Sequence, residues 1–359
     1  MERYSGATAA LSVIFMARLF LTVSSLENRT STPLAPALIA FGDSIVDPGN
    51  NNVLTTVVKC NFPPYGQDFV GSTPTGRFCN GKIPTDFLAA KMGIKEYLPP
   101  YLGSDLTPED ILTGVSFASG GTGFDPLTSK LVSVLSMPDQ LELFKKYASQ
   151  VRDIAGAEKG DAILAEAIYA IAAGNDDIAN TYFSTPFRRS LFDIPSYVNM
   201  IASYASAFVE ELINLGARRI GFVSLPPLGC LPSQRTLGGG IARACDPIRN
   251  QAAMLFNSKM AEVMRSLSEK YPGRKVVILD IYTSLLDMIE RPSSYGFVES
   301  TKGCCGTGTI EVTLLCNPLT PITCGDDSKY VFWDSFHPTE RAYEVLSDLL
   351  LRRYQRELQ

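Results

Sequence analysis

The chain has 359 residues, of which 45% are hydrophobic and 19% are charged, a composition typical of a globular protein with a large core. Its net charge of −5 at pH 7 argues against a nucleic-acid partner. There is a single histidine, His337, which excludes metal sites that need two or three imidazole ligands. Any general acid–base chemistry through an imidazole must therefore use His337.

The first residues have the features of a secretory signal peptide. Arg3 precedes a largely apolar stretch over residues 7–23, which is short for a membrane span and is interrupted by Arg18. The small residues that end at Ser25 predict cleavage after that position. A plain disordered start is the alternative interpretation.

This processing would divide the chain into a signal peptide over residues 1–25 and a single domain over residues 26–359. The mature chain would carry no transmembrane anchor and would be secreted to the extracellular space. A sequon begins at Asn28, just beyond the predicted cleavage point, so Asn28 is a candidate glycosylation site.

Five short apolar runs follow along the chain, and helical periodicity alternates with them. The runs are continuously apolar rather than alternating, which indicates parallel strands covered on both faces. We therefore predict an α/β protein, a three-layer α/β/α sandwich with a five-stranded parallel sheet of the flavodoxin-like kind. The expected strands lie at residues 36–41, 110–118, 167–173, 219–225 and 275–282, and the expected helices at 138–153, 197–215, 247–271 and 338–357.

Eight cysteines, an even number placed mostly in loops, indicate disulfide bonds formed in an oxidising compartment. No Cys-x-x-Cys pair occurs, which disfavours a zinc site. Local pairing is plausible within the first four cysteines, whereas the adjacent Cys304 and Cys305 are poorly placed to bond each other. The candidate pairs are Cys60 with Cys79, Cys230 with Cys245, and Cys304 and Cys305 with Cys316 and Cys324 in either of two connectivities.

Polar residues of one chemical theme follow the expected strands. Ser44, Gly120 and Asn175 come after the first three, and Asp334 and His337 follow the fifth. In open parallel sheets, functional residues collect at the carboxyl ends of the strands. A serine, a histidine and an aspartate are the set needed for covalent acyl transfer, and backbone N–H groups with an asparagine amide can bind the oxyanion.

Each of these residues alone has a structural interpretation. Ser44 and Asn175 are ordinary turn residues by type. The glycines at 120–123 could form a phosphate-binding loop, but no Lys-Ser or Lys-Thr follows them. A metallophosphoesterase would need several histidines.

Four segments together are much more specific than any one of them. FGDSIVDPGNNN (41–52), GVSFASGGTGFD (114–125), AGND (173–176) and DSFHP (334–338) resemble the four sequence blocks of the SGNH hydrolases. More narrowly, the chain is similar to the plant GDSL-type esterases/lipases over nearly its whole mature length. PPYG (63–66) and the cysteine-rich stretch at 304–324 belong to this similarity.

The resemblance implies roles for individual residues. Ser44 matches the nucleophile, Asp334 the acid and His337 the base of a catalytic triad. Ser44, Gly120 and Asn175 match the oxyanion donors, although Gly121 and Gly123 lie beside Gly120 and could replace it.

The function implied is that of a secreted serine esterase or lipase acting on small-molecule or lipid esters through an acyl-enzyme, with no metal and no cofactor. An acyltransferase using the same acyl-enzyme is one alternative, and a non-catalytic secreted binding protein is another. The acyl chain, the alcohol part and the oligomeric state are not predicted by the sequence.

Overall fold

The computed structural model describes residues 33–319 and 323–358. Its central sheet consists of four parallel strands in the order β1 (Leu38–Gly42), β2 (Ile168–Ala172), β3 (Arg219–Val223) and β4 (Lys275–Leu279). These strands correspond to four of the five predicted ones. The two-face burial of the apolar runs explains why they pair in parallel between helix layers.

The remaining predicted strand, at residues 110–118, is wrong as a regular strand. Thr107 caps a short helix, α3 (Pro108–Thr113), through a reciprocal hydrogen-bonded capping box with Asp110. Because of this cap and the proline at its start, the first half of the segment is helical rather than extended. The second half is extended and lies beside β1, with Phe117 N–H donating to Ala40 O at 2.8 Å. Four strands and one extended segment thus replace the expected five-stranded sheet.

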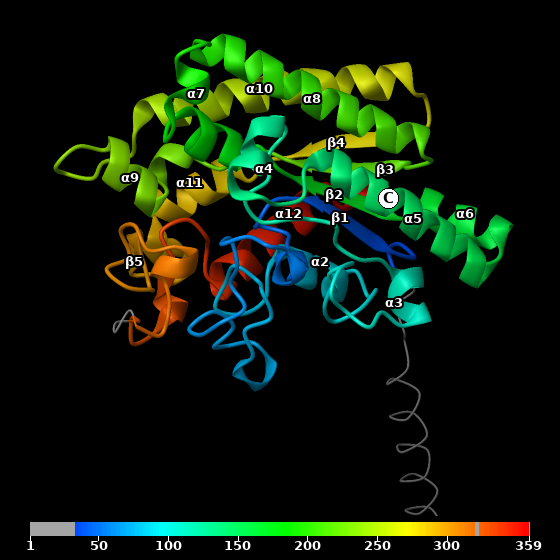
Figure 1. Ribbon diagram of the computed structural model, residues 1–359, viewed down its shortest axis with the longest axis horizontal. Helices are drawn as coiled ribbons and strands as arrows, with labels where there is room; N and C mark the ends of the chain where they lie inside the picture. Colours follow the sequence, from blue (N-terminus) through cyan, green and yellow to red (C-terminus); the bar gives the residue numbers. More distant parts are fainter. Residues whose placement is uncertain (1–32, 320–322, 359) are drawn as a thin grey trace, which may run out of the picture. The chain divides into compact units, whose positions relative to one another are not determined.

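Helices cover both faces of the sheet (Figure 1). The long helices α5 (Met137–Ala155), α8 (Ile194–Asn214) and α10 (Pro247–Lys270) lie on one face, and α12 (Glu340–Leu358) lies on the other with α2 (Pro84–Lys91). The four long helices confirm the predicted ones to within a few residues, and the three layers confirm the predicted sandwich. The shorter helices are α4 (Pro126–Val132), α6 (Ala157–Glu166), α7 (Pro186–Arg189), α9 (Pro232–Gly238) and α11 (Tyr282–Glu290).

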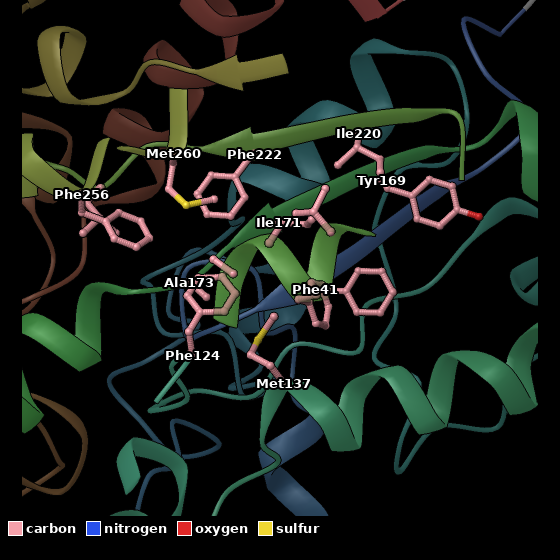
Figure 2. Close-up of a cluster of buried hydrophobic side chains, with 14 of the residues drawn as sticks. Phe41, Phe124, Met137, Tyr169, Ile171, Ala173, Ile220, Phe222, Phe256 and Met260 are labelled. Atoms are coloured by element: carbon pink, nitrogen blue, oxygen red, sulfur yellow. The ribbon is translucent and has the colours of Figure 1, made fainter. Parts of the chain in front are cut away.

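The two faces of the sheet bury side chains of very different size. Side chains alternate along a strand, so each strand contributes one set of residues to each face. Phe41, Tyr169 and Phe222 point into the layer under α5, α8 and α10, where large side chains fill the core (Figure 2). The face toward α2 and α12 carries small residues, among them Ala170 and Ala172.

A second, two-stranded parallel sheet lies near the C-terminus and was not predicted. It pairs β5 (Glu299–Gly303) with the short β6 (Tyr330–Phe332). Neither strand is a long apolar run, which explains why periodicity missed them. β6 leads directly into the segment that carries Asp334 and His337.

Six cysteines form disulfides, and two do not. The pairs are Cys230–Cys245, Cys304–Cys324 and Cys305–Cys316, which resolves the connectivity that the sequence left open. The predicted Cys60–Cys79 bond is wrong, because both thiols are free and buried. Cys60 packs in a cluster with Trp333, whereas Cys79 packs in a separate cluster with Tyr343, so their side chains have different neighbours.

The predicted signal peptide and the sequon at Asn28 lie outside the described residues. Within residues 33–319 and 323–358, none of the helices combines the length and the hydrophobicity of a membrane span.

Candidate active site

The loop that carries Ser44 is held tightly at the carboxyl end of β1. Gly42 has a φ of 134°, and a Cβ there would lie 1.8 Å from the carbonyl oxygen of Ala172, so only glycine fits. The Gln140 side chain from α5 pairs with both the N–H and the C=O of Gly42, each at 2.9 Å. Asp43 N–H donates to Ala172 O at 2.8 Å. These contacts fix the backbone that aims the Ser44 side chain.

Ser44, His337 and Asp334 form one hydrogen-bonded chain. The Ser44 hydroxyl lies 2.7 Å from His337 Nε2, and His337 Nδ1 lies 2.8 Å and 3.0 Å from the two Asp334 carboxylate oxygens. All three side chains are buried, with exposed fractions of 5% or less. The structure therefore brings together the three residues that the sequence predicted as a triad.

The Asp334 carboxylate is held by further donors. The backbone N–H groups of Phe336 and His337 donate to its Oδ1 at 2.8 Å and 2.7 Å. The hydroxyl of Tyr65 donates to its Oδ2 at 2.8 Å and in turn accepts the N–H of Thr313. Burial, followed by the nearby charge of Asp334, raises the pKa of the Tyr65 hydroxyl well above its usual value, so it stays a donor.

The sequence did not predict a role for Tyr65. It lies in the PPYG segment, 269 positions before Asp334 along the chain. The only sequence signal for Tyr65 was its place in the PPYG segment. That signal indicates family similarity and does not indicate contact with Asp334.

The predicted oxyanion donors are placed differently from one another. Asn175 donates one amide hydrogen to Asp43 Oδ2 at 2.8 Å, which leaves its second amide hydrogen for another acceptor. Gly120, which the sequence predicted as an oxyanion donor, already donates its N–H to Asp47 Oδ2 at 2.9 Å. Within the described part of the chain, the N–H groups of Ser44 and Gly121 donate no hydrogen bond.

Asp47 connects the serine loop to the glycine loop. Its carboxylate accepts the N–H groups of Gly49 and Asn50 at 2.8 Å and 2.7 Å, in addition to that of Gly120. Asn51 adds a second connection by donating its amide to Gly120 O. Burial raises the pKa of Asp47 to about 6.

Three buried carboxyl groups, those of Asp43, Asp176 and Asp177, also lie near one another. Burial raises the pKa of Asp43 to about 7, and burial raises that of Asp177 to about 7 as well. For Asp176, burial and then the charge of Asp43 raise the pKa well above its usual value. Among the described residues, no group of three or more histidine, cysteine or acidic side chains is arranged to hold a metal ion.

An α/β/α sandwich that places a serine against the single histidine at the carboxyl edge of its sheet is a fold of the SGNH hydrolase class. The chain belongs to the GDSL-like lipase/acylhydrolase family, whose sequence model matches residues 38–350. This confirms the predicted family, and the family is one of carboxylic ester hydrolases.

Curated relatives from Arabidopsis thaliana agree with this assignment over most of the chain. GDSL esterase/lipase EXL3 is 49% identical over 344 residues, which are 96% of this chain and 93% of that protein. GDSL esterase/lipase At3g14820 is 48% identical over 93% of this chain and 94% of its own length. GDSL esterase/lipase At5g42170 is 48% identical over 89% and 86%, respectively.

Proposed function

We propose that the mature protein is a secreted serine esterase that hydrolyses carboxylic esters through an acyl-enzyme on Ser44. The observation that carries this proposal is the 2.7 Å contact between the Ser44 hydroxyl and His337 Nε2, with Asp334 on the other ring nitrogen. A serine hydroxyl is a weak nucleophile unless a base accepts its proton, and this geometry supplies that base.

The first half of the reaction acylates Ser44. Its oxygen attacks the ester carbonyl while His337 Nε2 takes the hydroxyl proton, and the imidazolium that forms is stabilised by Asp334. His337 then gives that proton to the leaving alcohol as the carbonyl re-forms. In the second half, a water loses a proton to His337 and attacks the acyl carbonyl. His337 then returns that proton to the Ser44 oxygen as the bond to the acyl group breaks, which releases the carboxylic acid and restores the Ser44 hydroxyl.

The negative charge that develops on the carbonyl oxygen needs fixed donors. The N–H of Ser44 and the second amide hydrogen of Asn175 are available for it. Gly121 N–H, rather than the Gly120 N–H already bonded to Asp47, is the third donor in this proposal.

Secretion is supported by the three disulfides, since such bonds persist in oxidising compartments. The apolar N-terminal stretch that ends at Ser25 would direct export and be removed, and Asn28 would then be available for glycosylation.

A fluorophosphonate probe tests the central step. We expect it to label the mature protein at Ser44, whereas the Ser44→Ala variant should neither react nor hydrolyse p-nitrophenyl acetate. Labelling at another residue, with activity retained in the variant, would disprove the assignment. Alcohol acceptors added to the assay distinguish hydrolysis from acyl transfer. If the acyl group goes mainly to the added alcohol, the protein is an acyltransferase rather than a hydrolase.

A further inference from the structure

An apolar cavity of about 70 Å³ lies between the sheet and the helices α2 and α12. Ala170 and Ala172 of β2 form part of one wall, and Leu346 and Leu350 of α12 form part of the other. The cavity exists because this face of the sheet carries small side chains, whereas the opposite face is filled by aromatic rings (Figure 2).

The cavity lies beside the proposed active site. Asn175 lines it, and so do Ile45, which follows Ser44, and Phe336 and Pro338, which flank His337. Ser44 and His337 themselves do not line it. Asn175 is thus the residue that the cavity shares with the proposed oxyanion site.

A second cavity of about 30 Å³ adjoins the first one, and both are lined by Ala170, Leu279 and Leu350. The second cavity continues toward Tyr354 and Leu358, at the far end of α12. One water molecule needs roughly 10–15 Å³ of such space, so the first cavity has room for about five waters and the second for about two. A methylene group occupies about as much space as a water molecule.

Three unpaired hydroxyl groups interrupt the apolar lining. Thr85 on α2 and Tyr343 and Ser347 on α12 line the first cavity, and their hydroxyl oxygens have no hydrogen-bond partner among the described residues. Buried hydroxyls are normally paired, so these three can hold waters that have few other partners.

We propose that these cavities bind the acyl chain of the substrate, and that the preferred substrates are esters of straight acyl chains of roughly five to eight carbons, the number that this space accommodates. This inference rests on the proposed esterase function and names its substrate class. The upper limit follows from volume, since a longer chain would need the helices to move apart.

The chain-length profile of the wild-type enzyme is the first test. For p-nitrophenyl esters from acetate to palmitate, we expect kcat/KM to rise by roughly fourfold per added methylene group up to hexanoate or octanoate, and then to fall. A profile that is flat, or that decreases steadily from acetate, would overturn the inference.

Ser347 and Ser203 provide a matched pair of variants. Ser347→Leu places a larger apolar side chain in the first cavity, whereas Ser203→Leu makes the same change at an exposed position of α8 that lines neither cavity. We expect Ser347→Leu to lose at least tenfold in kcat/KM for p-nitrophenyl octanoate relative to p-nitrophenyl acetate, and we expect Ser203→Leu to keep the wild-type profile. Equal octanoate activity in the wild type and in a folded Ser347→Leu variant would overturn the inference.

Product inhibition covers the case in which Ser347→Leu does not fold. Free octanoate should inhibit hydrolysis of p-nitrophenyl acetate by the wild-type enzyme far more strongly than free butyrate does. Equal inhibition by the two carboxylates would argue against binding of the acyl chain in the cavity. Activity toward p-nitrophenyl acetate distinguishes failure of the proposed function from failure of the cavity assignment. If no ester is hydrolysed, the proposed function is wrong, whereas normal acetate hydrolysis without chain-length discrimination refutes only the cavity assignment.

Discussion

At the scale of single residues, Tyr65 holds the Asp334 carboxylate through the hydrogen bond of its hydroxyl. Its ring packs edge-on against Trp333 at 6.2 Å between centroids, so the hydroxyl reaches the carboxylate from a fixed position. Asp43 holds Asn175 in a comparable way. Both contacts act through another residue, and both are testable by small changes.

Tyr65→Phe removes one hydrogen bond to a charged group, which typically contributes about 1.5–3 kcal/mol. We expect kcat for p-nitrophenyl acetate to fall by about tenfold while KM changes little, because the substrate itself is not contacted. Tyr101→Phe is the matched control, since the Tyr101 hydroxyl bonds to Gln150 at the surface. Wild-type turnover in Tyr65→Phe would show that Asp334 does not depend on this donor.

Asn175→Ala removes a proposed oxyanion donor, an interaction whose loss typically costs roughly 2.7–4 kcal/mol of barrier, or 10²–10³-fold in kcat. We expect that loss with a melting temperature close to the wild type. Asn180→Ala, at an exposed position nearby, should keep full turnover. Normal turnover of the Asn175→Ala variant would show that Asn175 is not an oxyanion donor.

At the scale of elements, the buried strands and long helices were predictable because their hydrophobic patterns are strong. The segment at residues 110–118 was not, because Thr107 and Pro108 start a helix inside an otherwise apolar run. Cysteine spacing could not reveal that Cys60 and Cys79 lie in different clusters. The residues of the site were predicted by motif, yet the pairing of Gly120 N–H with Asp47 depends on the path of two loops.

The arrangement of the serine loop and the glycine loop depends mainly on Asp47. Asp47→Ala leaves three backbone N–H groups without their acceptor, and each buried unpaired group costs about 1–3 kcal/mol. We expect the free energy of unfolding to decrease by at least 3 kcal/mol in urea titrations. Ser133→Ala, at the end of α4, should change it little. A decrease below 1 kcal/mol would mean that the loops hold each other without Asp47.

At the scale of the whole molecule, the buried carboxyls should make stability depend on pH. The pKa values of Asp43 and Asp177 rise from 3.8 to about 7 and that of Asp47 to about 6, mainly through burial. The folded state therefore keeps protons that the unfolded chain has already lost. The contribution of these carboxyl groups to the free energy of unfolding is complete below pH 3.8, and it decreases as the pH rises toward 7.

We expect a higher melting temperature at pH 5 than at pH 8, with a difference in unfolding free energy on the order of a few kcal/mol. Asp177→Asn should reduce this difference, because an amide has no proton to lose over this range. Greater stability at pH 8 than at pH 5 would show that these carboxyls are ionised in the folded protein.

The distance along the chain between Ser44 and His337 sets the order in which the site is made. The two residues are 293 positions apart, and all four strands of the main sheet precede the histidine. During synthesis Ser44 emerges before the strands β2, β3 and β4, and His337 emerges after them. A nascent chain can thus form its main sheet before it has an imidazole next to the serine, so the proposed site is completed only after the sheet that carries it.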